Sequence, residues 1–258
     1  MVAGGAPDVR AACRMPELSV EAAAVRSRWR EVDAQQRALV LEQGTLWRSG
    51  LGASSNCLGG ETTLAWHHAV GSRDYDGLSS VGAPIQTVSR LRADEWHLSH
   101  RQPIAGPWAL SARLSAVRLR RDLAGVGAVQ GYPEQFTYWQ AALGARLALP
   151  VGASLLVAAD AWWGGGPAGR LALRLPTADP TSLTLGTTRT AELALRLQPR
   201  QPAGKGWTWD AAMEQRLTLL AAGPPGALMR NGALVGGAAQ PRTRQGEFAL
   251  GGRVGLRF

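Results

Sequence analysis

Apolar and polar residues alternate along much of the chain, and the alternation is most regular in GEFALGGRVGLRF, residues 246–258. Every second residue counted back from Phe258 is apolar or glycine, whereas the positions between include Glu247, Arg253 and Arg257. A period of two is the side-chain period of a β-strand, in which successive side chains point to opposite faces. The stretch therefore predicts a strand with one apolar and one charged face.

The same two-faced alternation recurs in nine earlier segments: 19–31, 37–55, 60–73, 84–101, 107–121, 135–148, 153–163, 187–198 and 206–220. Most of these segments are long for strands of globular proteins, whose commonest length is about five or six residues. They match the length that a tilted strand needs to cross a bilayer. We therefore predict an all-β fold, an antiparallel transmembrane β-barrel of about ten strands over residues 19–258.

The faces opposite the apolar ones carry charged residues, which predicts a narrow barrel interior filled by mutually paired ions. The expected lumen charges are Arg146, Asp160, Glu192, Arg196, Asp210, Glu214, Arg216, Arg253 and Arg257. The alternative is a soluble barrel or sandwich with its apolar faces turned inward. That alternative predicts many Lys and Glu residues, but the chain has a single lysine, Lys205, and its apolar faces mix Leu with Ala and Gly. The pattern favours the membrane barrel.

The connections between the segments fall into two sets. Those near 56–60, 101–106, 149–152 and 199–205 are short, and those near 74–83, 122–134, 164–186 and 221–245 are long; the first, near 32–36, is a short exception. Short periplasmic turns and long extracellular loops are typical of outer-membrane barrels. Residues 169–186 and 226–237 alternate again and predict hairpins above the bilayer. If the first hairpin belongs to the barrel wall, the strand count becomes twelve.

Tryptophan is abundant, with 10 residues against 3 phenylalanines and 3 tyrosines. Aromatic residues gather at both water interfaces of membrane barrels, because their rings are apolar and their edges polar. In the predicted topology they fall at strand ends and form two aromatic girdles. The expected girdle tryptophans are Trp108, Trp139, Trp163, Trp207 and Trp209.

Composition narrows the range of partners. The net charge of +9 comes almost entirely from arginines that recur at alternate strand positions or in turns, so no nucleic-acid partner is expected. The two cysteines, Cys13 and Cys57, lack the spacing of a metal site, and neither a metal nor a cofactor is expected. Residues 1–18 lack the apolar core of a secretory signal, so we interpret them as a disordered or mis-assigned N-terminal segment.

The last strand resembles the C-terminal signature of Gram-negative outer-membrane proteins, in which a final aromatic residue follows alternating hydrophobic residues. The matching residues are Phe248, Leu250, Val254, Leu256 and Phe258. The resemblance implies a porin-like protein of the cell envelope, located in the outer membrane. It also implies folding by the barrel-assembly machinery and contact with outer-membrane lipid and lipopolysaccharide.

Titratable residues are densest in AWHHAVGSRDYDG, residues 65–77, which offers His67, His68, Asp74 and Asp76 as candidate catalytic residues. Outer-membrane proteases of the omptin type use aspartates and a histidine at the extracellular rim, where the pair holds a general base. Three hypotheses follow. The chain is a non-enzymatic envelope or surface-loop interaction protein, a narrow arginine-rich channel or transporter, or an omptin-like hydrolase; we favour the first.

Overall fold

The structure is a computed structural model that describes residues 16–57, 59–78, 83–200 and 205–258. Strands and connecting loops make up these ranges, and they contain no helix that is long and apolar enough to cross a membrane. The prediction for residues 1–18 lies largely outside the described residues. Its boundary moves slightly, because the first strand begins at Glu17, two residues before the predicted start.

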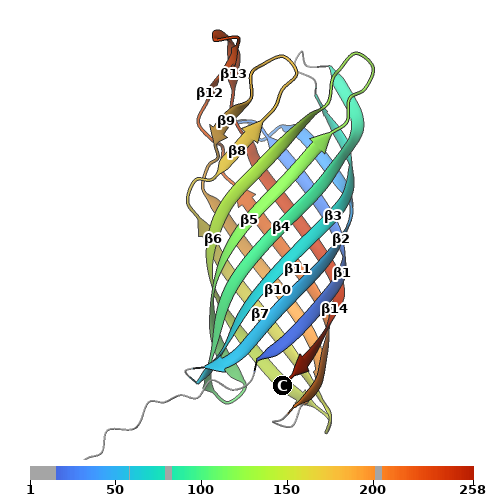
Figure 1. The fold of residues 1–258 in the computed structure, drawn as a ribbon, viewed down its shortest axis with the longest axis vertical. Coiled ribbons are helices and arrows are strands. Elements are labelled where there is room, and N and C mark those ends of the chain that lie inside the picture. Colours follow the sequence, from blue (N-terminus) through green and yellow to red (C-terminus); the bar gives the residue numbers. More distant parts are fainter. Residues whose placement is uncertain (1–15, 58, 79–82, 201–204) are drawn as a thin grey trace, which may run out of the picture.

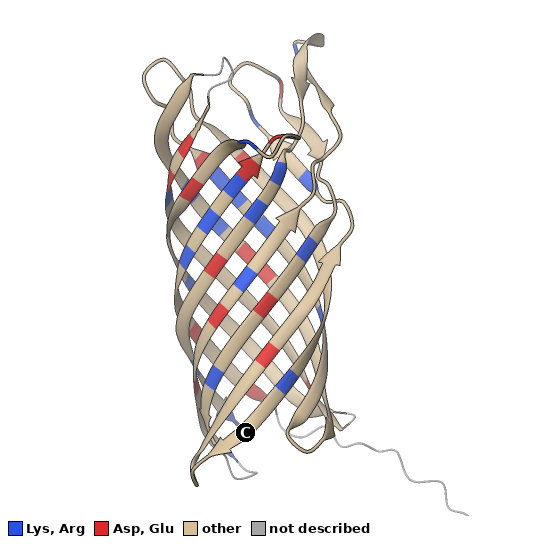
Figure 2. Ribbon diagram, turned by 180° about the vertical axis from the view of Figure 1, so that it is seen from behind, with Lys and Arg blue, Asp and Glu red and all other residues tan. Residues whose placement is uncertain are grey.

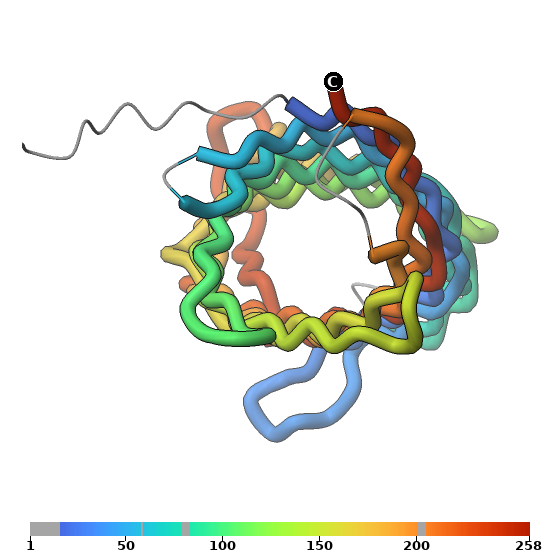
Figure 3. Tube along the Cα trace, turned by 90° about the horizontal axis from the view of Figure 1, so that it is seen from below, coloured from blue at the N-terminus to red at the C-terminus, as the bar shows by residue number. Residues whose placement is uncertain are grey.

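Ten strands of the described part close into an antiparallel barrel (Figures 1 and 3). The prediction of about ten strands is thereby confirmed. Their order around the wall follows the sequence, and the last strand pairs with the first. The barrel strands are β1 (Glu17–Val32), β2 (Ala38–Cys57), β3 (Gly60–Leu78), β4 (Pro84–Ala105), β5 (Trp108–Leu123), β6 (Tyr132–Val151), β7 (Leu155–Gly166), β10 (Thr188–Pro199), β11 (Gly206–Leu220) and β14 (Arg242–Arg257).

The strand register fixes the tilt of the wall. Followed once around the barrel from Glu17, the paired positions return to β1 at Trp29, twelve residues further along the strand. A shear close to the number of strands gives strands tilted by about 35–45°, as in membrane barrels. The barrel is therefore narrow, and side chains fill most of its interior.

The two ends of the barrel differ. Both Glu17 and Arg257 lie at the end where neighbouring strands are joined by short connections, which we call the turn end; the opposite end is the loop end. At the loop end, β8 (Arg170–Leu173) and β9 (Thr181–Thr184) form a hairpin that pairs with β6. The hairpin is not part of the closed wall, so the twelve-strand alternative is wrong.

A second hairpin, β12 (Gly226–Arg230) with β13 (Ala233–Ala238), forms a separate sheet and projects beyond the loop end of the barrel (Figure 1). Its turn is Asn231–Gly232, with φ angles of 51° and 78°. Positive φ at both central residues defines the tight hairpin turn that Asn-Gly favours. The local sequence therefore accounts for this element.

Strand β1 shows how the environment of the side chains changes along the barrel. Near the turn end, Leu18 is 52% exposed on the outer wall while Glu17 is buried inside. Near the loop end the pattern is reversed, because Trp29 is buried inside and Arg28 is exposed outside. The side-chain period stays two throughout. The reversal therefore reports the surroundings: apolar outside and charged inside within the bilayer, and beyond it charged outside with both apolar and paired charged side chains inside.

Outward-facing apolar residues form a continuous band around the turn half of the wall. Members include Leu18, Val20, Leu51, Leu64, Leu98, Leu110, Leu114, Leu143, Leu193, Leu195, Met213, Leu250 and Val254, all of them exposed. A soluble protein does not expose so large an apolar surface. The band is the surface that a transmembrane barrel presents to lipid.

Candidate functional site

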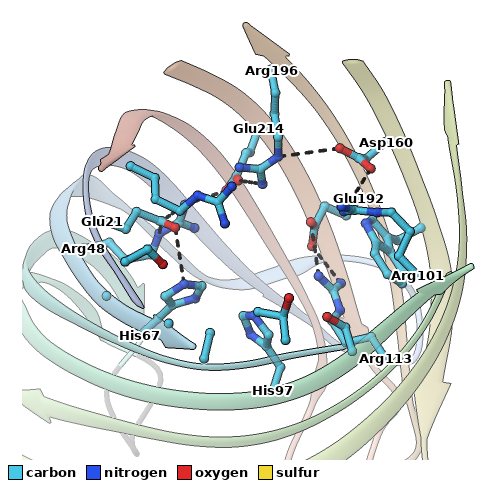
Figure 4. A pocket seen from close by; sticks show the side chains of 18 of the residues that line it. Glu21, Arg48, His67, His97, Arg101, Arg113, Asp160, Glu192, Arg196 and Glu214 are labelled. Atoms are coloured by element: carbon cyan, nitrogen blue, oxygen red, sulfur yellow. Dashed lines mark hydrogen bonds and ion pairs between the residues drawn. The ribbon is translucent and has the colours of Figure 1, made fainter. Parts of the chain in front are cut away.

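The barrel interior is the best-defined candidate site, and charged residues of both signs line it (Figure 4). Along the strands, basic and acidic residues recur throughout the barrel (Figure 2). A cavity of about 120 Å³ occupies the turn half, and a second of about 60 Å³ lies nearer the loop end. Arg48, His67 and Arg216 line both cavities and form the layer between them. The larger cavity is roomy enough for several water molecules.

Ion pairs cross the lumen from one wall to another. Arg48 on β2 pairs with Glu21 on β1, at 2.9 Å, and with Glu214 on β11. Glu214 in turn accepts a hydrogen bond from Arg196 on β10, at 2.7 Å. Figure 4 shows these side chains meeting in the centre of the barrel. The network joins four strands, the neighbours β1 and β2 and the neighbours β10 and β11.

A second network of ion pairs is centred on Glu192, on β10. Its carboxylate accepts hydrogen bonds from Arg113 at 2.9 Å and from Arg216 at 3.1 Å. Arg216 also pairs with Glu95 at 2.7 Å, so it bridges two carboxylates. The Arg113 guanidinium lies 4.6 Å from the ring centre of Trp162, a cation–π contact inside the lumen. The sequence pattern did not single out Arg113, Glu95 or Trp162.

The remaining predicted lumen charges also lie inside and in pairs. Asp210 accepts a hydrogen bond from Arg253 at 2.6 Å. The other pairs are Arg196–Asp210, Arg146–Asp160 and Arg257–Glu17. Removing two ions from water is costly unless each is paired. The charges of the lumen are therefore bound to one another and hold the strands of the wall together.

Two histidines contribute to the larger cavity. His67 and His97 lie in contact, with ring centres 4.8 Å apart, and His67 is 3.5 Å from Glu21. The buried Nδ1 atoms of both rings and Nε of Arg101 have no hydrogen-bond partner among the described residues. Buried polar atoms of this kind need water or a small polar ligand in the cavity.

Apolar side chains close the lumen at the loop end. We call this group the loop-end plug: Trp29, Phe136, Leu171, Leu185 and Leu220, each 2% exposed or less. They belong to one hydrophobic cluster, to which the β8–β9 hairpin also contributes. The rings of Trp29 and Phe136 meet edge to face, with centres 5.3 Å apart.

Arg121 is the central polar residue beside the plug. It forms ion pairs with Glu31, Glu42 and Glu134, and its guanidinium lies 5.1 Å from the ring centre of Trp29. All of these groups are buried. Arg121 therefore holds three carboxylates from three strands against the aromatic pair, and Arg73 also pairs with one of them, Glu42, at 3.5 Å.

The structure does not bring the four candidate catalytic residues together. His67 points into the lumen, whereas His68, Asp74 and Asp76 occupy the alternate, outward-facing positions of β3. The two histidines also lie away from the loop end, because they pair with Glu95 and Asp94 in the middle of β4. Side chains on opposite faces of a strand cannot share a catalytic site.

His68 takes part in a different group on the outer wall. Its Nδ1 lies 2.8 Å from a carboxylate oxygen of Asp94, and the Trp66 ring stacks on the imidazole with centres 5.8 Å apart. Trp96 lies beside Trp66, with ring centres 6.0 Å apart. The half-buried His68–Asp94 pair therefore lies beside the two tryptophans. This contact accounts for the position of Trp66, which lies away from the strand ends.

The predicted girdle and terminal-strand residues lie on the outer wall. The five girdle tryptophans are exposed: Trp108, Trp139, Trp163, Trp207 and Trp209. The same holds for Phe248, Leu250, Val254 and Phe258, whereas Leu256 is half-buried. The role of this strand in assembly stays a prediction.

No protein-family model matches the sequence, and no curated protein matches it. Among solved structures, the outer membrane protease OmpT of Escherichia coli is similar over 96% of this chain and 98% of its own, with 9% identity and a TM-score of 0.56. The β domain of the Bordetella autotransporter BrkA (13% identity, 93% and 99% covered, TM-score 0.44) and the toluene transporter TodX of P. putida (11%, 98% and 91%, 0.35) are more distant. The fold is that of an outer-membrane β-barrel.

Proposed function

We propose that the chain is a non-enzymatic outer-membrane barrel that acts at its loop end, on partners outside the bilayer. In this proposal the loop end faces outward, the turn end faces the periplasm, and the interior serves as a scaffold. The observation that carries the proposal is the loop-end plug with Arg121 beside it. A lumen filled in this way supports neither a wide path for solutes nor an open site for substrate.

The distribution of histidine also supports a non-enzymatic role. The four histidines of the chain, His67, His68, His97 and His100, lie on β3 and β4, in the middle or toward the turn end. Asp74 and Asp76, by contrast, lie toward the loop end and face outward. A general base of the aspartate–histidine type needs the two groups within hydrogen-bond reach. His68 and Asp94 meet this condition, but they lie on the outer wall in the middle of β3 and β4, away from the lumen.

The β12–β13 hairpin is the loop element that we assign to partner contact. Its side chains Leu234 and Val235 are 68% and 52% exposed, and the hairpin itself projects beyond the barrel rim. Exposed apolar side chains on a projecting element are typical of a protein–protein contact. The partner in this proposal is a protein that buries these side chains.

Planar-bilayer recordings and peptide-cleavage assays on the refolded protein test the proposal together. We expect no stepwise ion conductance, because the plug closes the lumen, and no cleavage of unstructured basic peptides. Either stepwise conductance or peptide hydrolysis that survives further purification contradicts the proposal. The first result favours the channel hypothesis, and the second favours the hydrolase.

A further inference from the structure

A patch of five arginines covers the outer wall where β1 pairs with β14. Its members, which we call the seam patch, are Arg26, Arg28, Arg30, Arg242 and Arg244. All five occupy the outward-facing positions of their strands, since the residues that alternate with them face the interior. Four are exposed and Arg30 is half-buried. The proposed function gives this patch no role.

The seam patch begins where the apolar band ends. Arg26 lies directly opposite Phe248, an exposed residue of the wall, and Leu250 follows Phe248 toward the turn end. Arg28 and Arg30 lie successively closer to the loop end. In a membrane the patch therefore lies at the level of the lipid headgroups, directly above residues that contact acyl chains.

The patch lacks negative charge from the protein. Arg30 and Arg244 are direct cross-strand partners, an arrangement of like charges that destabilises a sheet. The outward residues next to them on the flanking strands are Leu41 and Leu219. Within the described ranges none of the five arginines forms an ion pair, whereas Arg120 on β5 has Asp122 at 3.0 Å.

Gly246 lies at the centre of the patch, opposite Arg28 and between Arg244 and Phe248. A Cβ added here would have no atom within 4 Å, so no packing contact inside the protein requires glycine at this position. Glycine interrupts a strand at some cost to its stability. It leaves a flat spot between the arginines on which another molecule can lie close to the backbone.

We propose that the seam patch binds a lipid of the surrounding leaflet whose headgroup carries two phosphates. Guanidinium groups bind phosphate through paired hydrogen bonds, and phosphate supplies the missing negative charge. Arg26 to Arg30 spans roughly 13 Å at about 3.3 Å per residue, more than one phosphate needs. The adjoining apolar wall at Phe248 selects a lipid over free phosphate. Lipopolysaccharide of the outer leaflet has this chemistry, and its assignment rests on the proposed orientation with the loop end outward.

Lipid binding to refolded protein in mixed micelles tests the assignment. The test variant is Arg28→Gln/Arg30→Gln/Arg244→Gln. The control, Arg170→Gln/Arg174→Gln/Arg230→Gln, removes three exposed arginines from the loops at the same end of the barrel. We expect diphosphoryl lipid A to bind at least about tenfold more weakly to the test variant and unchanged to the control. Lipid A stripped of its phosphates is expected to bind all three proteins weakly.

Three results would overturn the inference. If the parent and the test variant bind lipid A with equal affinity, the seam patch is not the binding site. If the control variant loses as much affinity as the test variant, the effect is one of general charge. Full displacement of the lipid by inorganic phosphate shows a free-anion site instead. The readout is lipid binding itself, so it stands apart from the conductance and cleavage assays of the proposed function.

Gly246→Leu provides a second, charge-neutral variant. The Cβ of the new side chain would meet no atom within 4 Å, so heat-modifiable mobility in detergent is expected to match that of the parent. Diphosphoryl lipid A is expected to bind more weakly, because the leucine keeps the headgroup away from the arginines. Unchanged affinity would contradict a phosphate site at the centre of the patch.

Discussion

Arg120 and Arg121 are neighbours in sequence, yet they meet opposite environments. Arg120 points outward and pairs with Asp122 in solvent, with both side chains about half exposed. Arg121 points inward, is 3% exposed, and is surrounded by Glu31, Glu42 and Glu134. The side-chain period of the strand alone produces this difference. The pair is therefore a matched test of what a buried cation contributes.

We expect Arg121→Met to lower the free energy of unfolding by roughly 3–5 kcal/mol, because three buried carboxylates lose their common partner. Arg120→Met is expected to cost under about 1 kcal/mol, as for other exposed ion pairs. Urea unfolding of the refolded barrel in detergent, followed by tryptophan fluorescence, measures both. Similar losses in the two variants would mean that the Arg121 cluster is not a stabilising centre.

Single residues also show where sequence interpretation succeeds. Glu192, Arg216 and Asp210 could be assigned to the lumen because each alternates with outward apolar residues over a long strand. Parity likewise places Trp162 on the same face as Asp160, and its contact with Arg113 shows what the ring does in the lumen. The same parity separates His67 from His68 and Asp74, which lie on the other face of the strand. Grouping these residues by nearness in sequence was the error.

At the level of elements, the barrel strands could be predicted, but the side chains that fill the interior between their loop-end halves could not. The alternation marks a strand wherever it runs, but its meaning reverses beyond the bilayer, as Trp29 and Arg28 illustrate on β1. The interior plug was missed for this reason, because its residues lie on the face that carries charges in the turn half. The two loop hairpins were predicted. The pairing of β8 with β6, and the separation of β12–β13 into its own sheet, depend on the fold.

The β12–β13 hairpin is expected to be dispensable for folding. It forms its own sheet, and the hydrogen bond from the Asp179 amide to the Met229 carbonyl, at 2.7 Å, joins it to the turn between β8 and β9 rather than to a barrel strand. Replacing residues 226–238 by a short Gly-Ser linker should leave heat-modifiable mobility and urea resistance unchanged, while it abolishes capture of a surface partner by the proposed contact. Loss of the folded form in detergent would show instead that the hairpin supports the barrel. Leu234→Ser/Val235→Ser serves as the milder variant, because it keeps the turn.

At the scale of the whole molecule, closure of the lumen depends on a few aromatic contacts. The ion-paired turn half contains cavities, whereas the loop half is packed around Trp29 and Phe136. We therefore expect Trp29→Ala/Phe136→Ala to convert a silent barrel into a conducting one in planar bilayers. Arg73 and Arg121 stay beside the opened path together with their partners Glu31, Glu42 and Glu134, so neither sign of ion is expected to be strongly preferred, and the reversal potential in a salt gradient measures this.

The matched control for that variant removes two aromatic residues from the outer wall. Trp139→Ala/Trp163→Ala deletes exposed rings and leaves the lumen closed, so it should stay silent. Each buried aromatic removed costs about 3–5 kcal/mol, and heat-modifiable mobility must show that the plug variant is still folded before its conductance is interpreted. A folded plug variant as silent as the parent would place the closure elsewhere, in the Arg121 cluster or in the Arg48 and Arg216 layer.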